Sequence, residues 1–275
     1  MDSRDQTSWF ELMPPDGPGP TVVAVPYAGG SGRAFRSLRR HVPADCGLAL
    51  VDLPGHGRQV NGTCLRDADQ AATGLLEALD ALPATGFVLL GHSLGGLVAA
   101  RFVAGALAPA AAWSRPVDVL LLSSPVLVTA MKPLQKAMLA VLGPLTPNHA
   151  VANGLKPEWI SRDPAVVAAY KADPLVHDRI APRLARFIVD GCELVQRAAP
   201  RWTVPTLLLY AGADRCVRPA GSAAFAAAAS KGLVTARVYP TLFHEIMNEP
   251  EQGEVLSAFA EGLDTLTASP PRNPT

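Results

Sequence analysis

Residues 87–107 read FVLLGHSLGGLVAARFVAGAL, and this stretch decides the fold class of the chain. Residues 87–90 are apolar without interruption, which is typical of a β-strand that is buried on both faces. Residues 91–96, GHSLGG, favour a tight turn, and residues 97–107 have the composition of a buried helix. The stretch therefore predicts a strand, a sharp turn that carries Ser93, and a helix.

Other short, mostly apolar runs predict the rest of a sheet. They lie at residues 21–25, 48–53, 117–122, 206–210 and 236–239. Helical patterns separate most of these runs, as at residues 65–82. Strands that alternate with helices in this way indicate an α/β fold, with a mostly parallel sheet and helices on both faces.

One interval, residues 126–203, breaks this alternation, because it has helical composition in three proline-punctuated segments and no convincing strand. The segments are residues 131–142, 163–172 and 179–199. Ligands of open α/β sheets bind at the carboxyl ends of the strands, so an insertion that leaves the sheet there covers the site. We therefore predict a core formed by residues 1–125 and 204–275, with residues 126–203 as a helical lid.

The composition fits a globular protein and argues against several classes of partner. The chain has 275 residues, 49% of them hydrophobic, which is enough for a sizeable core. Its 24 Lys and Arg residues balance 24 Asp and Glu residues without a long block of one sign, so the charge gives no support to a nucleic-acid partner. His92, Ser93 and Arg101 interrupt the longest apolar stretch, so we expect no transmembrane segment.

The cysteines indicate a reducing compartment. They are Cys46, Cys64, Cys192 and Cys216. Their spacing is neither that of a metal site nor that of a disulfide scaffold, so we expect buried free thiols and no metal. Residues 1–20 are polar and lack an apolar signal core, which leads us to expect a cytoplasmic protein. Two proline-rich stretches, residues 14–20 and 269–275, are predicted to be frayed ends.

Ser93 has the setting of a nucleophile. Gly91 and Gly95 leave room for a strained turn from which the serine hydroxyl projects. A helix that begins just after the serine points its backbone N–H groups at the place where an oxyanion would form. We expect the N–H of Leu94 to be the first oxyanion donor.

A serine hydroxyl is a weak nucleophile unless a base takes its proton. In a strand, turn and helix of this kind, the acid and then the histidine follow the serine in sequence. Of the later histidines, His149 and His177 fall in the expected lid, whereas His244 follows the last predicted strand. Asp214 lies in the loop after the penultimate predicted strand, where it can orient the imidazole. We predict a catalytic triad of Ser93, Asp214 and His244.

The second oxyanion donor is expected in the glycine-rich loop at residues 26–32, PYAGGSG. We favour Ala28, with Tyr27 as the alternative. A nucleotide site is disfavoured, because no Lys-Ser or Lys-Thr follows the loop and no Gly-x-Gly-x-x-Gly is present. We interpret His92 and the turn at residues 52–57, DLPGHG, as structural.

These motifs resemble those of the α/β-hydrolase superfamily and, within it, the monoacylglycerol lipase and lysophospholipase-like group. Besides residues 91–96 and 52–57, the resemblance rests on SSP at residues 123–125, DPLV at residues 173–176 and FHEIMNEP at residues 243–250. It covers nearly the whole chain. It implies a hydrolase that needs no cofactor, works through an acyl-enzyme intermediate and holds the acyl chain in a channel under the lid.

The oxyanion loop departs from that group. Its members usually carry His-Gly and an acidic residue there, whereas residues 26–31, followed by Ala34 and Phe35, resemble type II thioesterases of polyketide and peptide synthases. We expect hydrolysis of a carboxylic ester with a medium or long acyl chain. A thioesterase and an acyltransferase or cyclase remain alternatives. A non-catalytic binding protein is disfavoured, because the serine, acid and histidine are all present.

The expected partner is a small-molecule acyl ester or thioester, and contact with an acyl carrier or a lipid surface stays open. Tyr27 and Trp159 are the candidate substrate-binding residues. Phe187, Leu194 and Val195 could also line an acyl pocket, although apolar residues at helical spacing more often belong to a core. The sequence does not indicate an oligomeric state.

Overall fold

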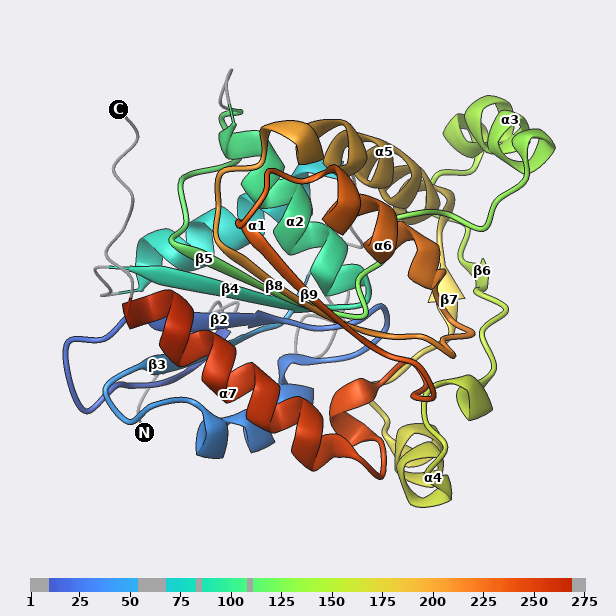
Figure 1. The fold of residues 1–275 in the computed structure, drawn as a ribbon. Helices are drawn as coiled ribbons and strands as arrows, with labels where there is room; N and C mark the ends of the chain where they lie inside the picture. Colours follow the sequence, from blue (N-terminus) through green and yellow to red (C-terminus); the bar gives the residue numbers. More distant parts are fainter. Residues whose placement is uncertain (1–9, 54–67, 83–85, 108–110, 269–275) are drawn as a thin grey trace, which may run out of the picture.

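The computed structural model describes residues 10–53, 68–82, 86–107 and 111–268 (Figure 1). Its centre is a seven-stranded sheet in the order β1-β3-β2-β4-β5-β8-β9. Every neighbouring pair is parallel except β1 with β3, so the predicted mostly parallel sheet is confirmed. The strands are β1 (Phe10–Met13), β2 (Thr21–Val25), β3 (Gly47–Val51), β4 (Phe87–His92), β5 (Val119–Ser123), β8 (Thr206–Ala211) and β9 (Val234–Tyr239).

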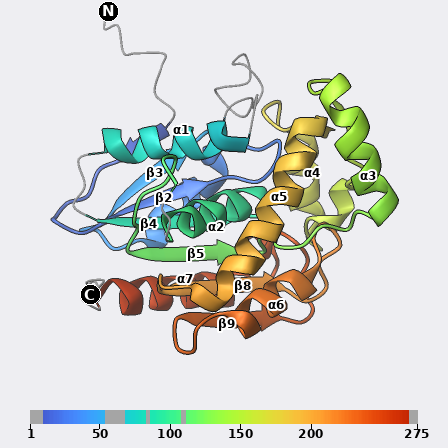
Figure 2. The same ribbon diagram turned by 90° about the horizontal axis from the view of Figure 1, so that it is seen from above.

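Helices cover both faces of the sheet, as predicted (Figure 1 and Figure 2). One face carries α1 (Ala68–Ala81), α2 (Leu94–Ala106), α5 (Pro182–Ala198) and α6 (Pro219–Ala228). The opposite face carries the 3₁₀ segment η1 (Gly32–His41) and the helix α7 (Gln252–Ala268). Among the helices in the described ranges, none combines the length and the apolar character needed to cross a bilayer.

Strand β4 illustrates why the strand sequences lack polar alternation. Leu89 packs in the hydrophobic cluster on the side of α1 and α2, and Leu90 packs in the cluster on the side of η1 and α7. Both side chains are buried, because helices cover both faces of the strand. The carboxyl ends of the parallel strands meet at one edge, where their loops can bring polar side chains together.

The N-terminal region corrects one expectation. Residues 14–20 are not frayed, because the N–H groups of Asp16 and Gly19 donate to the carbonyl oxygens of Ala44 and Asp45 at 2.8 and 2.9 Å. Strand β1, which precedes them, pairs antiparallel with β3 and is not among the predicted strands. Its sequence, FELM, is half-buried at the sheet edge and has no β-branched residue, so its pattern is weak. Residues 54–57 and 269–275 lie outside the described residues.

The predicted lid, residues 126–203, contains α3 (Pro133–Leu142), α4 (Pro164–Ala172) and α5. Two short strands, β6 (Val151–Ala152) and β7 (Arg179–Ile180), pair antiparallel within it, so the insertion is not entirely helical. Shorter 3₁₀ segments are η3 (Gly143–Leu145), η4 (Pro157–Trp159) and η5 (Ala199–Arg201). Figure 2 shows α3 and α4 beyond the end of the sheet, whereas α5 runs against α2.

Helix α5 differs from the rest of the insertion in its packing. Phe187 and Val195 are buried in the same cluster as α2, and Leu194 packs against that cluster. These three side chains are therefore part of the core, which is one of the two interpretations that their spacing allowed. Helix α3, in contrast, has no buried residue. The function of residues 126–203 as a lid stays a prediction.

Candidate active site

Ser93 occupies a strained turn between β4 and α2. Its backbone has φ 56° and ψ −118°, a conformation that residues other than glycine rarely adopt. Its N–H donates to the carbonyl oxygen of Ser123 at 3.0 Å, and its own carbonyl oxygen accepts from the N–H groups of Val126 and Leu97 at 3.1 and 3.2 Å. These hydrogen bonds fix the turn from β5, from the chain that follows β5 and from α2.

Two glycines permit this geometry through close packing. A Cβ atom on Gly95 would lie 2.1 Å from the carbonyl oxygen of Val25 and 2.4 Å from that of Pro26. A Cβ atom on Gly91 would lie 2.3 Å from the carbonyl oxygen of Gly95. The start of α2 can therefore approach β2 and β4 only because these two positions have no side chain.

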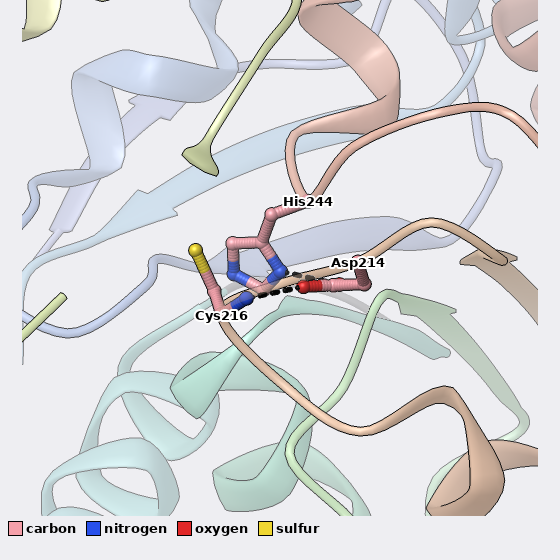
Figure 3. Close-up of side chains that lie close together, drawn as sticks. All are labelled: Asp214, Cys216 and His244. Atoms are coloured by element: carbon pink, nitrogen blue, oxygen red, sulfur yellow. Dashed lines mark hydrogen bonds and ion pairs between the residues drawn. The ribbon is translucent and has the colours of Figure 1, made fainter. Parts of the chain in front are cut away.

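Asp214 and His244 form a hydrogen-bonded pair (Figure 3). Their loops follow β8 and β9, and the His244 Nδ1 to Asp214 Oδ2 distance is 2.7 Å with both side chains almost fully buried. The other oxygen, Oδ1, accepts from the N–H groups of Cys216 and Val217 at 2.8 and 2.9 Å. The carboxylate is therefore fixed in place and holds Nδ1, which leaves Nε2 as the free nitrogen of the imidazole.

His92 connects the serine turn to His244. Their two rings lie 4.8 Å apart between centroids, and His92 Nδ1 lies 3.0 Å from both the carbonyl oxygen and Oγ of Ser123. Burial, and then the proximity of His244, lower the pKa of His92 well below its usual range. His92 is therefore neutral and anchored, which fits a packing residue. Because Ser93 directly follows His92, the packing of His244 on His92 brings His244 toward the serine turn.

The glycine-rich loop is held from two sides. The N–H of Gly32 donates to Asp52 Oδ1 at 2.8 Å, so Asp52 has the loop-capping contact expected of a structural turn. The N–H of His177, from the insertion, donates to the carbonyl oxygen of Gly29 at 3.2 Å. Gly29 has φ 77°, and a Cβ atom there would lie 2.2 Å from the carbonyl oxygen of His177. Ala28 stays the predicted second oxyanion donor within this clamped loop.

The candidate substrate-binding residues differ in their surroundings. Tyr27 lies edge-on to His92 and near Tyr170 of α4, each at 6.0 Å between ring centroids, and burial raises its pKa. Trp159 is half-buried in the insertion, with Lys156 Nζ 5.7 Å from its ring. Tyr27 therefore packs near His92, the residue before Ser93. The substrate-binding role of both residues stays a prediction.

One buried carboxylate was not among the predicted site residues. It lies behind the loop that carries His244, residues 240–245, which we call the histidine loop. Glu249 is fully buried and accepts from the backbone N–H and from Nε of Arg162, each at 2.5 Å. It also accepts from the N–H of Phe243, the residue before His244, at 3.2 Å. The motif at residues 243–250 contains Glu249, but its partner Arg162 lies 87 residues earlier in a segment with no matching signal.

Glu245, the residue after His244, faces the interior. It is buried, and that burial raises the pKa of its carboxyl, whereas Asn248 Nδ2 opposes the shift by donating to Oε2 at 2.5 Å. Its N–H donates to the carbonyl oxygen of Ile160 at 2.7 Å, which adds a second link from the insertion to the histidine loop. Tyr27, His92, Ser123, Glu245 and Asn248 are among the residues that line a small cavity of about 20 Å³.

A larger open groove, of about 590 Å³, lies between α4 and the histidine loop. It is lined by Glu158, Arg162, Val167, Ala168, Lys171 and Phe243, among others. Within the described residues, one group of three or more side chains could hold a metal ion, and it consists of Asp214, Cys216 and His244. Two of its members are the acid and the histidine of the predicted triad.

Comparison with known sequences matches the chain to one family model and to several lipases. The family model, described as serine aminopeptidase S33, matches residues 23–251. The chain is 35% identical over 247 residues to a monoacylglycerol lipase of Mycolicibacterium smegmatis, which covers 86% of this chain and 85% of that protein. It is 26% identical over 251 residues to human monoglyceride lipase, over 86% of this chain and 78% of that protein.

Solved structures give the same relationship. The chain superimposes on the monoacylglycerol lipase of Paleococcus ferrophilus with a TM-score of 0.84 and 28% identity, over 94% of this chain and 98% of that one. A monoglyceride lipase variant from Saccharomyces cerevisiae, solved with a substrate analogue, has a TM-score of 0.77 over 94% of this chain and 91% of that one. At 16% identity, the second match supports the fold alone.

Gly95→Ala tests the close packing of the serine turn. The new methyl group would overpack against two carbonyl oxygens, so we expect the free energy of unfolding to fall by roughly 1–3 kcal/mol, measured by urea unfolding. The matched control is Gly253→Ala in α7, where no atom lies within 4 Å of the added Cβ. It should leave stability unchanged or raise it by up to about 1 kcal/mol. Equal stability of the two variants would contradict this account of the turn.

Proposed function

The chain belongs to the serine aminopeptidase S33 family of α/β-hydrolases, and we propose that it hydrolyses carboxylic esters of medium or long acyl chains, such as monoacylglycerols or lysophospholipids. As predicted from the sequence, it is an enzyme of the esterase and lipase type. The observation that carries the proposal is the buried 2.7 Å contact between His244 Nδ1 and Asp214 Oδ2, with the His244 ring 4.8 Å from that of His92, the residue before Ser93.

In the proposed reaction, Ser93 Oγ attacks the ester carbonyl carbon while His244 Nε2 takes the hydroxyl proton. Asp214 stabilises the imidazolium through its hydrogen bond to Nδ1. The N–H groups of Leu94 and Ala28 bind the oxyanion, and the start of α2 adds a favourable dipole. The protonated histidine then donates its proton to the departing alkoxide, which leaves the acyl group on Ser93.

A water molecule completes the cycle in the reverse sense. His244 Nε2 takes one of its protons, the resulting hydroxide attacks the acyl-enzyme, and the proton returns to Ser93 Oγ as the free acid leaves. The same groups serve a thioester, because both substrates pass through a tetrahedral oxyanion. We favour the oxygen ester because two relatives that match over more than three quarters of their own length are named monoacylglycerol lipase and monoglyceride lipase.

We further propose that α3 brings the enzyme to its substrate by contacting a lipid surface. Its exposed apolar side chains, with the adjoining η3, form one row: Leu134, Met138, Val141, Leu142 and Leu145. Leu134 and Leu145 are 72% and 75% exposed, and the helix has no buried residue. An apolar row of this kind marks an interaction surface, and a lipid surface is where a long-chain ester is held.

A cytoplasmic location is part of the proposal. Cys46 and Cys192 are buried and Cys216 is half-buried, and free thiols at these positions would fit a reducing compartment; Cys64 lies outside the described residues. Burial raises the pKa of Cys192 to about 12 and that of Cys46 to about 11, which favours the protonated thiol at neutral pH. The proposed enzyme therefore works from the cytoplasm on lipid at a membrane surface.

The triad is tested by single substitutions. Ser93→Ala and His244→Ala should remove most ester hydrolysis, and Asp214→Asn should lower kcat on the order of 10⁴-fold because the imidazole loses its orienting carboxylate. Steady-state kinetics on a short p-nitrophenyl ester measures all three. A fluorophosphonate probe should label the parent at Ser93 and fail to label Ser93→Ala.

Matched controls use the same substitutions outside the site. Ser230→Ala, His149→Ala and Asp190→Asn change side chains near the surface of the protein, and each should keep kcat within about twofold of the parent. Near-normal turnover in Asp214→Asn would show that another residue is the acid.

A substrate panel tests the leaving group and the reaction. Monoacylglycerols, lysophospholipids, acyl-thioesters and aminoacyl anilides are compared by kcat/KM, with product analysis by mass spectrometry. We expect the long-chain oxygen esters to be preferred and the product to be the free acid. Efficient cleavage of thioesters with oxygen esters untouched would favour the thioesterase alternative, and an ester, amide or ring as product would favour an acyltransferase or cyclase.

The role of α3 is tested with the double variant Leu134→Asp and Leu145→Asp. Binding to phosphatidylcholine and phosphatidylglycerol vesicles should weaken at least about tenfold, because burying one leucine contributes roughly 1.5–3 kcal/mol. Co-sedimentation measures it, and hydrolysis of a soluble short-chain ester should stay unchanged. Val238→Asp, an exposed apolar position on β9, is the control. The proposal would be overturned if the parent did not bind vesicles, or if the parent and the double variant bound them equally.

A further inference from the structure

Cys216 lies beside the acid and the histidine, but the proposed reaction does not use its thiol. Figure 3 shows the three side chains together, with the sulfur of Cys216 next to the imidazole of His244. One ligand atom from each of Asp214, Cys216 and His244 lies within 4.8 Å of the other two. Cys216 is half-buried.

The hydrogen bond within the pair prepares the imidazole as a ligand. Asp214 Oδ2 accepts from His244 Nδ1 at 2.7 Å, so the lone pair of the neutral ring is on Nε2. Histidines that bind metal ions commonly donate their other N–H to a carboxylate, which fixes the tautomer and raises the basicity of the ligand nitrogen. The hydrogen bond between Asp214 and His244 would therefore serve two purposes. It orients His244 as a base, and it also orients Nε2 as a metal ligand.

The buried carboxylate of Asp214, beside Cys216 and His244, favours a cation at this place. A divalent ion would be attracted by that carboxylate and would stabilise the thiolate that binds it. Soft thiolate and imidazole ligands together suit zinc and related ions.

We propose that Cys216 Sγ and His244 Nε2 form an inhibitory site for a thiophilic divalent cation of the zinc type. On binding, the thiol proton is released to solvent, bonds form from the metal to Sγ and to Nε2, and two metal-bound waters leave. Nε2 is then no longer able to accept the proton of Ser93. Inhibition rests on the proposed function, whereas metal binding at these two atoms is independent of it.

Cobalt spectroscopy tests the binding without relying on activity. Co²⁺ added to the Ser93→Ala protein and to the parent should give a thiolate-to-cobalt charge-transfer band that saturates at one ion per chain. Cys216→Ser and Cys216→Ala keep the backbone N–H that donates to Asp214 and should lack the band. Cys192→Ser, which changes a buried thiol outside the group, should retain it.

Inhibition by Zn²⁺ is measured in parallel on a soluble ester. The half-inhibitory Zn²⁺ concentration should rise at least about tenfold in Cys216→Ser and stay unchanged in Cys192→Ser, and a chelator should restore the parent's activity. Absence of the cobalt band, or its persistence in both Cys216 variants, would overturn the site. A band that depends on Cys216, combined with equal Zn²⁺ inhibition of the parent and Cys216→Ser, would overturn the inhibitory role.

Discussion

The backbone conformation of Ser93 is the constraint on which the rest of the site depends. A backbone φ of 56° in a residue with a side chain lowers the stability of the fold by on the order of 1–3 kcal/mol. Such a conformation persists only where the surrounding structure holds it. Here β5 accepts its N–H, and Gly95 allows α2 to begin against β2. Strand β4 has neighbours on both sides, so the strain is held by the best-supported part of the sheet.

The parallel order of the strands explains how distant residues meet at this turn. Asp214 and His244 belong to loops after β8 and β9, which are separated from β4 by β5. Parallel strands end at a common edge, so the loops converge although the residues lie far apart in sequence. The buried ring of His92, the residue before Ser93, packs 4.8 Å from the ring of His244 and so links the serine turn to the histidine loop.

Much of the fold could be predicted because its signals are local. The run at residues 21–25 coincides with β2, and the glycine-flanked serine marks the junction of β4 and α2. Asp214 and His244 could be proposed from their order after the serine and from their positions after the last two predicted strands. In the structure, His244 Nδ1 and Asp214 Oδ2 lie 2.7 Å apart. Strand β1 was missed because four half-buried residues at the sheet edge, without a β-branched side chain, give only a weak strand pattern.

Non-local contacts account for what the sequence could not indicate. Arg162 and Glu249 pair across 87 residues, and neither position carries a pattern that depends on the other. Cys216 is only two residues from Asp214 in sequence. The proximity of its sulfur to His244, in contrast, depends on how the loops after β8 and β9 pack together. The surroundings of a lone cysteine, and the pairing of a buried carboxylate with a distant arginine, are determined only in the folded chain.

Two contacts make residues 126–203 part of the support of the candidate site. They are the hydrogen bond from His177 to Gly29 and the ion pair between Arg162 and Glu249. His177 supports the glycine-rich loop, and Arg162 neutralises a carboxylate that would otherwise be buried alone at a cost of several kcal/mol. Exchanging residues 126–203 between related enzymes to alter substrate preference therefore transfers these supports as well. A graft that keeps Arg162 and the His177 backbone contact, and varies only α3 and its flanks, respects the architecture of this protein.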